Sequence, residues 1–148
     1  MKKITLLLLT LILVACSAGS SEFDQNFSKW EKANIKDYRF SLYIGCFCAF
    51  RNQMPLTVEV KNGEVISMTY SDGSIVTNTD PSFETFSSYG TIDRIFSVLK
   101  AGQSGDADEV TVTYDTAHGF PSEIYFDFIK DAVDDEVSIQ VSNFELLK

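Results

Sequence analysis

The chain has 148 residues, of which 12 are basic and 21 acidic, so its formal net charge is −9. An acidic surface repels the phosphate backbone, and the composition therefore excludes nucleic-acid binding. Aromatic residues make up 13% of the chain and the mean hydropathy is +0.01, values that exclude a disordered chain. The length fits one domain of ordinary size.

The first sixteen residues have the three-part pattern of an export signal. Lys2 and Lys3 precede an apolar run over residues 4–15, and Cys16 follows. A membrane-spanning anchor is the alternative, but twelve helical residues span about 18 Å and the hydrocarbon core is about 30 Å thick. The pattern predicts a signal peptide over residues 1–15 that is removed after export.

The four residues Leu13-Val14-Ala15-Cys16 resemble the lipobox of bacterial lipoproteins. The resemblance implies a lipid on the Cys16 thiol, cleavage before Cys16, and acylation of the new amino terminus by a fatty acid such as palmitate. We therefore expect an exported protein whose membrane partner is reached through this lipid. Ser17 after Cys16 implies the outer membrane, facing the periplasm, where a cell has two membranes. Otherwise we expect the outer face of the cell membrane.

Cleavage leaves 133 residues of the 148, divided into a small polar spacer over residues 16–21 and one domain over residues 22–148. Without Lys2 and Lys3, 10 basic and 21 acidic residues remain, a net charge of −11. Residues 101–148 hold 2 of the basic and 11 of the acidic residues. Such acidity disfavours lying flat on anionic lipid, so we expect the lipid to provide the membrane attachment.

Helical spacing of Phe23, Phe27 and Trp30 predicts a first helix over residues 22–33, capped by Ser21 and ended by Asn34. A second helix is predicted to begin after Thr91 and to end at Gly102. Residues 73–90, rich in small polar side chains, are predicted to be a loop.

Alternation of apolar and polar residues predicts six strands. They cover approximately residues 38–44, 56–61, 65–70, 110–114, 124–128 and 137–144. Asn62-Gly63 is the strongest signal for a two-residue hairpin turn.

The order α-β-β-β-α-β-β-β predicts an α+β fold, with an antiparallel sheet of about six strands and two helices on one face. It suggests two fused helix-plus-meander modules. The alternation predicts that the other sheet face meets solvent. We expect an exposed row there, formed by Thr57, Glu59, Thr111, Thr113, Tyr125 and Asp127.

Cys46 and Cys48 remain after Cys16 is assigned to the lipid. In an exported protein two remaining thiols usually pair, which favours a local disulfide that requires a turn or bulge near Gly45. Two free thiols, and a redox or soft-metal site, are the alternatives. The loop-entropy relation gives a three-residue ring only about 1.6 kcal/mol of stabilisation before strain.

Five carboxylates lie within ten residues, at Asp127, Asp131, Asp134, Asp135 and Glu136. Oxygen ligands of this kind suit calcium, but the spacing does not match the twelve-residue calcium loop. A solvated acidic turn is the favoured interpretation, with a cation site as the alternative.

The sequence contains no motif of a known catalytic site. His118, the one histidine, is interpreted as a turn residue, and no phosphate-binding glycine loop, zinc-protease motif or nucleophile elbow is present. We therefore expect no enzymatic activity, no metal and no cofactor.

Residues 30–146 resemble an uncharacterised family of small bacterial lipoproteins, a domain of unknown function. The resemblance rests on Cys46-Phe47-Cys48, the Asn62-Gly63 turn, Tyr114-Asp115, Gly119-Phe120-Pro121 and Asp134-Asp135-Glu136. It implies kinship of fold and an envelope location, and no activity. More loosely, the α-β-β-β doubling is similar to PepSY-like and inhibitor-like domains, which bind proteins through a sheet face.

We expect a membrane-tethered, non-catalytic envelope lipoprotein that serves as a protein-binding or structural module, with an envelope protein as its partner. The alternative is a thiol-redox or metal-handling envelope factor that uses Cys46 and Cys48. That alternative requires sulfur atoms that solvent can reach.

Overall fold

The computed structural model of the chain describes residues 21–148. The predicted signal peptide, the predicted lipidation site at Cys16 and residues 16–20 of the predicted spacer lie outside these residues. Within the described part, no helix has both the length and the apolar character needed to cross a membrane.

Six antiparallel strands form one sheet in the order β3-β2-β1-β6-β5-β4, which confirms the predicted α+β fold. The strands are β1 (Tyr38–Gly45), β2 (Leu56–Lys61), β3 (Glu64–Thr69), β4 (Glu109–Tyr114), β5 (Pro121–Asp127) and β6 (Val137–Leu146). The first half of the chain supplies one helix and a three-strand meander, and the second half supplies two helices and a three-strand meander. The central pair β1 and β6 joins the two halves.

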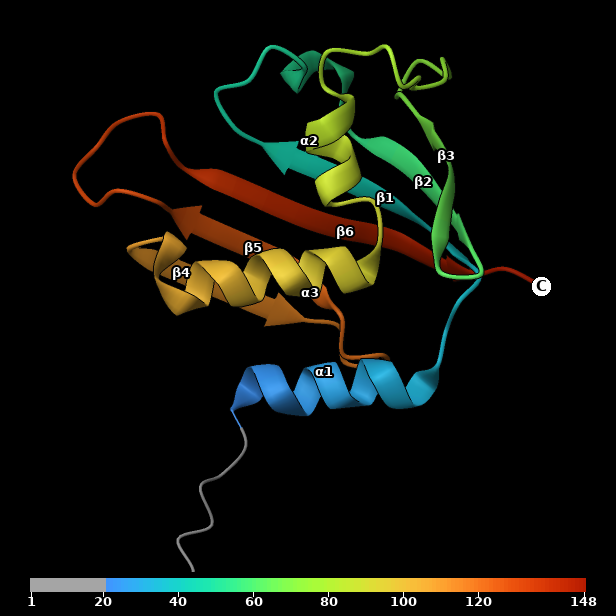
Figure 1. The fold of residues 1–148 in the computed structure, drawn as a ribbon, viewed down its shortest axis with the longest axis horizontal. Helices are drawn as coiled ribbons and strands as arrows, with labels where there is room; N and C mark the ends of the chain where they lie inside the picture. The colour runs from blue at the N-terminus through green and yellow to red at the C-terminus, as the bar shows by residue number, and fades with distance from the viewer. Residues whose placement is uncertain (1–20) are drawn as a thin grey trace, which may run out of the picture.

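The helices lie on one side of the sheet. They are α1 (Glu22–Ala33), α2 (Phe83–Ser88) and α3 (Ile92–Ala101), with short helical turns η1 (Arg51–Gln53) and η2 (Gly102–Asp106). In Figure 1, α2 and α3 cross in front of the sheet and α1 runs below α3. Aromatic contacts join α1 to α3 and to the sheet. The ring centroids of Phe27 in α1 and Phe96 in α3 are 5.0 Å apart, and those of Trp30 in α1 and Tyr38 in β1 are 5.6 Å apart.

Local signals explain the helix ends. The Ser21 hydroxyl accepts from the Asp24 amide while the Asp24 carboxylate accepts from the Ser21 amide, a reciprocal cap that begins α1 at the predicted residue. Asn34 ends α1, as predicted, and the structure shows it in a left-handed conformation. Thr91 caps α3 by accepting from the Arg94 amide.

One prediction about the helices was wrong in detail. The predicted loop over residues 73–90 contains α2, because Phe86 is fully buried against Phe50 and Tyr70 and tertiary packing stabilises this short helix. Helix α3 ends at Ala101 with Gly102 as its C-cap, as predicted. Gly102 keeps right-handed helical angles, and its hydrogen atom allows close packing, since a Cβ atom there would lie 2.4 Å from the Phe126 ring.

Candidate functional site

The cysteine segment and the acidic turn, interpreted separately from sequence, meet in space. Because β1 and β6 are antiparallel neighbours, the end of β1 lies beside the beginning of β6 (Figure 1). The two segments enclose a hollow of about 260 Å³, called here the apical hollow. It is lined by Tyr43, Gly45, Cys46, Phe47, Arg51, Asp134 and Glu136.

The cysteine segment forms one wall. Cys46 and Cys48 are placed as a disulfide pair with Cα atoms 5.2 Å apart, and both residues are half-buried. Phe47 between them is 80% exposed, whereas Phe50 is buried and packs 4.9 Å from Phe86. The segment is thus anchored beneath by one aromatic ring and presents another to solvent.

The acidic turn between β5 and β6 forms the opposite wall. The Asp135 carboxylate accepts from the Ile129 amide at 2.6 Å, and the Asp108 carboxylate accepts from the Lys130 amide at 2.8 Å. These two carboxylates therefore hold the backbone of the turn. Asp134 and Glu136 are left to line the hollow.

Gly45 forms part of the lining where the backbones of β1 and β6 pair. An added Cβ atom would lie 2.3 Å from the Ser138 hydroxyl oxygen and 3.0 Å from the Tyr43 ring. Any side chain at position 45 would thus crowd both neighbours. The absence of a side chain there lets β1 and β6 pair closely beside the hollow.

Arg51 enters the hollow from the cysteine side. The Arg51 amide donates to the Cys48 carbonyl at 3.2 Å, which begins the η1 turn directly after the disulfide segment. Among the residues that the structure describes, no ion pair joins the Arg51 guanidinium to Asp134 or Glu136. Opposite charges therefore line one hollow without being paired.

The five carboxylates considered for calcium do not gather in one place. Asp135 binds backbone, Asp134 and Glu136 line the hollow, and Asp127 lies in β5 opposite Glu109 of β4. Within residues 21–148, no three His, Cys, Asp or Glu side chains are grouped so that they could hold a metal ion. The cation site remains a prediction without geometric support.

Asp127 lies in a negative environment. Partial burial raises the pKa of its carboxyl group, and the charges of Asp135, Glu136, Glu109 and Asp108 raise it further. Strands β4, β5 and β6 contain no Lys or Arg, so no cation of these strands offsets the repulsion. This edge of the sheet is electrostatically suited to a cationic group.

The sheet face opposite the helices continues from the apical hollow. All six residues of the predicted row (Thr57, Glu59, Thr111, Thr113, Tyr125 and Asp127) are exposed or half-buried. Thr111, Tyr125, Ser138 and Gly45 form one row across four strands. Thr57 lies beside Ser41 of β1, which in turn lies beside Ser142 of β6. This polar surface, here the open face, is not covered by α1, α2 or α3.

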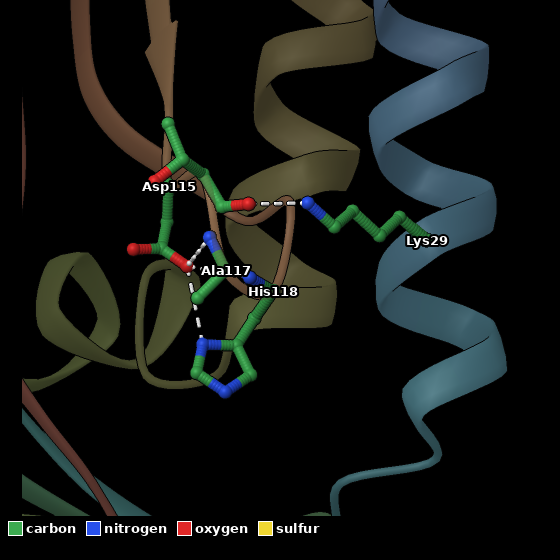
Figure 2. A network of polar contacts seen from close by, with 5 residues as sticks. Lys29, Asp115, Ala117 and His118 are labelled. Carbon is green, nitrogen blue, oxygen red and sulfur yellow. Dashed lines mark hydrogen bonds and ion pairs between the residues drawn. The ribbon is translucent and has the colours of Figure 1, made fainter.

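A second polar network lies at the opposite end of the sheet, in the turn between β4 and β5. One Asp115 carboxylate oxygen accepts from the amides of Ala117 and His118 and contacts the His118 Nδ1 at 3.1 Å (Figure 2). The Lys29 ammonium of α1 donates to the Thr116 carbonyl. His118 is a turn residue, as predicted, and this network ties α1 to the turn.

Sequence reasoning identified both walls of the apical hollow but not Arg51, Tyr43 or the role of Gly45. Arg51 carries no local motif, and the meeting of residues 45 and 138 depends on the central β1–β6 pairing. The one available signal was Gly45 itself, because a glycine at the end of a predicted strand can mark a place where another segment of backbone approaches closely.

Residues 22–146 match the family described as a family of unknown function, DUF6174, and the chain belongs to this family. The family is uncharacterised, so membership assigns no activity. Comparison with curated proteins and with solved structures gives no match.

Proposed function

We propose that the protein is a membrane-tethered, non-catalytic lipoprotein of the bacterial cell envelope, which binds an envelope protein through the open face. The tether is the lipid on Cys16 implied by the lipobox resemblance. The observation that carries the binding role is the uncovered polar face, whose carboxylates on the β4–β5 side form no ion pair with another described residue.

The charge on this face indicates the kind of partner. Glu109, Glu123 and Asp127 project from β4 and β5, whose sequences contain no basic residue. Complementary charge raises the association rate and disfavours wrong partners. The proposed partner therefore presents a basic or neutral surface to this side of the sheet.

Site-specific photo-crosslinking in the native envelope tests this proposal. A photoreactive amino acid at Thr111, exposed on the open face, is expected to give a discrete adduct. The same amino acid at Ser97, exposed on α3 on the helical side, serves as the matched control. Equal adducts at both positions, or none at Thr111, would contradict the proposal.

A second candidate function is thiol–disulfide exchange at Cys46 and Cys48. It is favoured by their position in a surface segment where both cysteines are only half-buried. Alkylation with and without reductant tests it. If the fraction of alkylated Cys46 and Cys48 rises and falls reversibly with the ratio of reduced to oxidised small thiol in the buffer, exchange is supported. A disulfide that the same buffer does not reduce contradicts it.

A further inference from the structure

The apical hollow combines three properties. It has a cation on one wall, carboxylates on the other and aromatic rings beside them. The guanidinium of Arg51 and the carboxylates of Asp134 and Glu136 form no ion pair with one another or with another described residue. Unpaired opposite charges held apart in one concave site can each bind a complementary group of one ligand.

We propose that the apical hollow binds a small zwitterion, with its carboxylate at Arg51 and its ammonium at Asp134 and Glu136. A free amino acid and a short peptide share this chemistry. The planar guanidinium fork matches a carboxylate with two parallel hydrogen bonds, and an ammonium group donates three.

Charge balance argues against simpler ligands. A bare anion that reaches Arg51 meets the repulsion of two carboxylates across the hollow. A bare cation at Asp134 and Glu136 meets the repulsion of Arg51. A zwitterion is attracted at both walls, so the arrangement discriminates in its favour.

The remaining lining indicates the size and side chain of the ligand. The volume of about 260 Å³ lies below the roughly 300–1,000 Å³ of pockets for drug-sized ligands, and suits a ligand of one or two residues. Tyr43 and the exposed ring of Phe47 supply apolar and aromatic surface. An apolar or aromatic side chain can pack there, and the ring faces also favour the ammonium group.

This inference deepens the proposed binding role and rests on the open face being a binding surface. Binding of a small ligand needs neither the lipid nor the envelope partner. A failure of crosslinking in cells and a failure of ligand binding in vitro are therefore separate results.

Titration of the full-length protein in detergent, followed by NMR shifts and calorimetry, tests the inference. The probes are L-phenylalanine, phenethylamine, which lacks the carboxylate, and 3-phenylpropionate, which lacks the ammonium. L-phenylalanine is expected to bind at least about tenfold more tightly than either analogue, because each loses charge-assisted hydrogen bonds. The dipeptide Ala-Phe distinguishes a short peptide from a free amino acid as the ligand. Tighter binding than that of L-phenylalanine indicates a peptide, and weaker binding indicates a free amino acid.

Variants that remove one charge each test which group of the ligand binds Arg51 and which binds the carboxylates. Arg51→Gln is expected to weaken L-phenylalanine at least about tenfold while leaving phenethylamine unweakened. Glu136→Gln is expected to weaken L-phenylalanine and phenethylamine but not 3-phenylpropionate. Lys130→Gln and Glu31→Gln, which change the same charges outside the hollow, are the matched controls, and thermal unfolding checks that each variant is folded.

Two results would overturn the inference. One is the absence of binding by L-phenylalanine and by Ala-Phe up to about 10 mM, a concentration that would detect a ligand with a dissociation constant of about 1 mM. The other is equal binding of the zwitterion and both analogues, unaffected by Arg51→Gln.

Discussion

Gly45 and Ser138 face each other across the central β1–β6 pair so closely that a Cβ atom at position 45 would lie 2.3 Å from the Ser138 hydroxyl oxygen. The same contact lies in the apical hollow, which Gly45 lines. Packing of the two halves of the chain beside the candidate site thus depends on the absence of a side chain at position 45.

Gly45→Ala is expected to lower the free energy of unfolding by about 1–2 kcal/mol, because overpacking must displace the Ser138 hydroxyl and the Tyr43 ring. Ser138→Ala alone is expected to change it by less than about 0.5 kcal/mol. Without that hydroxyl the nearest atom of residue 138 is its Cβ at 3.7 Å, an ordinary contact. The double variant should recover most of the lost free energy of unfolding, as measured by urea unfolding. If the effects of the two substitutions simply add, the proposed contact is contradicted.

Gly119→Ala is expected to destabilise the protein more than Gly73→Ala. Both glycines have positive φ, 83° and 88°, so both substitutions incur the backbone cost. Only at Gly119 does the new Cβ meet another element, 2.7 Å from the Asn26 carbonyl oxygen of α1, while nothing lies within 4 Å at Gly73. We expect about 1 kcal/mol for Gly73→Ala and at least about 2 kcal/mol for Gly119→Ala.

Urea unfolding of the two glycine variants measures this difference. Proteolysis within α1 gives a second measurement, since Gly119→Ala should increase cleavage there and Gly73→Ala should not. Equal stabilities would show that the contact between α1 and the β4–β5 turn contributes little.

Asp127→Asn is expected to raise the melting temperature at pH 7. Because the folded protein raises the pKa of Asp127 above its ordinary 3.8, the folded state binds a proton more tightly than the unfolded chain. The ionised carboxylate therefore lowers stability above its folded pKa, and this penalty disappears as the pH falls below 3.8. Thermal melts of both proteins should converge at low pH.

Salt provides the control for Asp127. Screening should reduce the neutral-pH difference in melting temperature, since exposed charges produce the repulsion. A variant that is less stable than the native protein at pH 7, or a difference that is independent of pH, would contradict the assigned environment.

The disulfide is expected to contribute little to global stability. The loop-entropy relation for a three-residue ring gives about 1.6 kcal/mol before strain, so Cys46→Ser/Cys48→Ser should lose no more than this and keep the native circular dichroism spectrum. The local effect should be larger, with faster hydrogen exchange confined to the cysteine segment and the η1 turn. A loss above about 3 kcal/mol would instead make the disulfide a main support of the fold.

Local signals in the sequence predicted most of the architecture. The reciprocal cap at Ser21 and the apolar spacing of α1 located that helix, and Asn62-Gly63 located the β2–β3 hairpin, where both residues have positive φ. These features depend on neighbours in the chain. Short-range chemistry is therefore enough to identify them.

The features missed from sequence depend on distant contacts. Helix α2 has six residues, too few to be stable alone, and it exists because Phe86 enters the core. The apical hollow requires that β1 pair with β6, which no local signal specifies. Arg51 becomes part of a site only because this pairing brings Asp134 and Glu136 opposite it.

Mass spectrometry of the protein isolated from membranes of its native host tests the proposed lipid tether most directly. The account predicts a chain that begins at Cys16 and carries lipid on its thiol and an acyl group on its amino terminus, and Cys16→Ser should abolish both. Recovery of a water-soluble chain that still begins at Met1 and carries no lipid would contradict it.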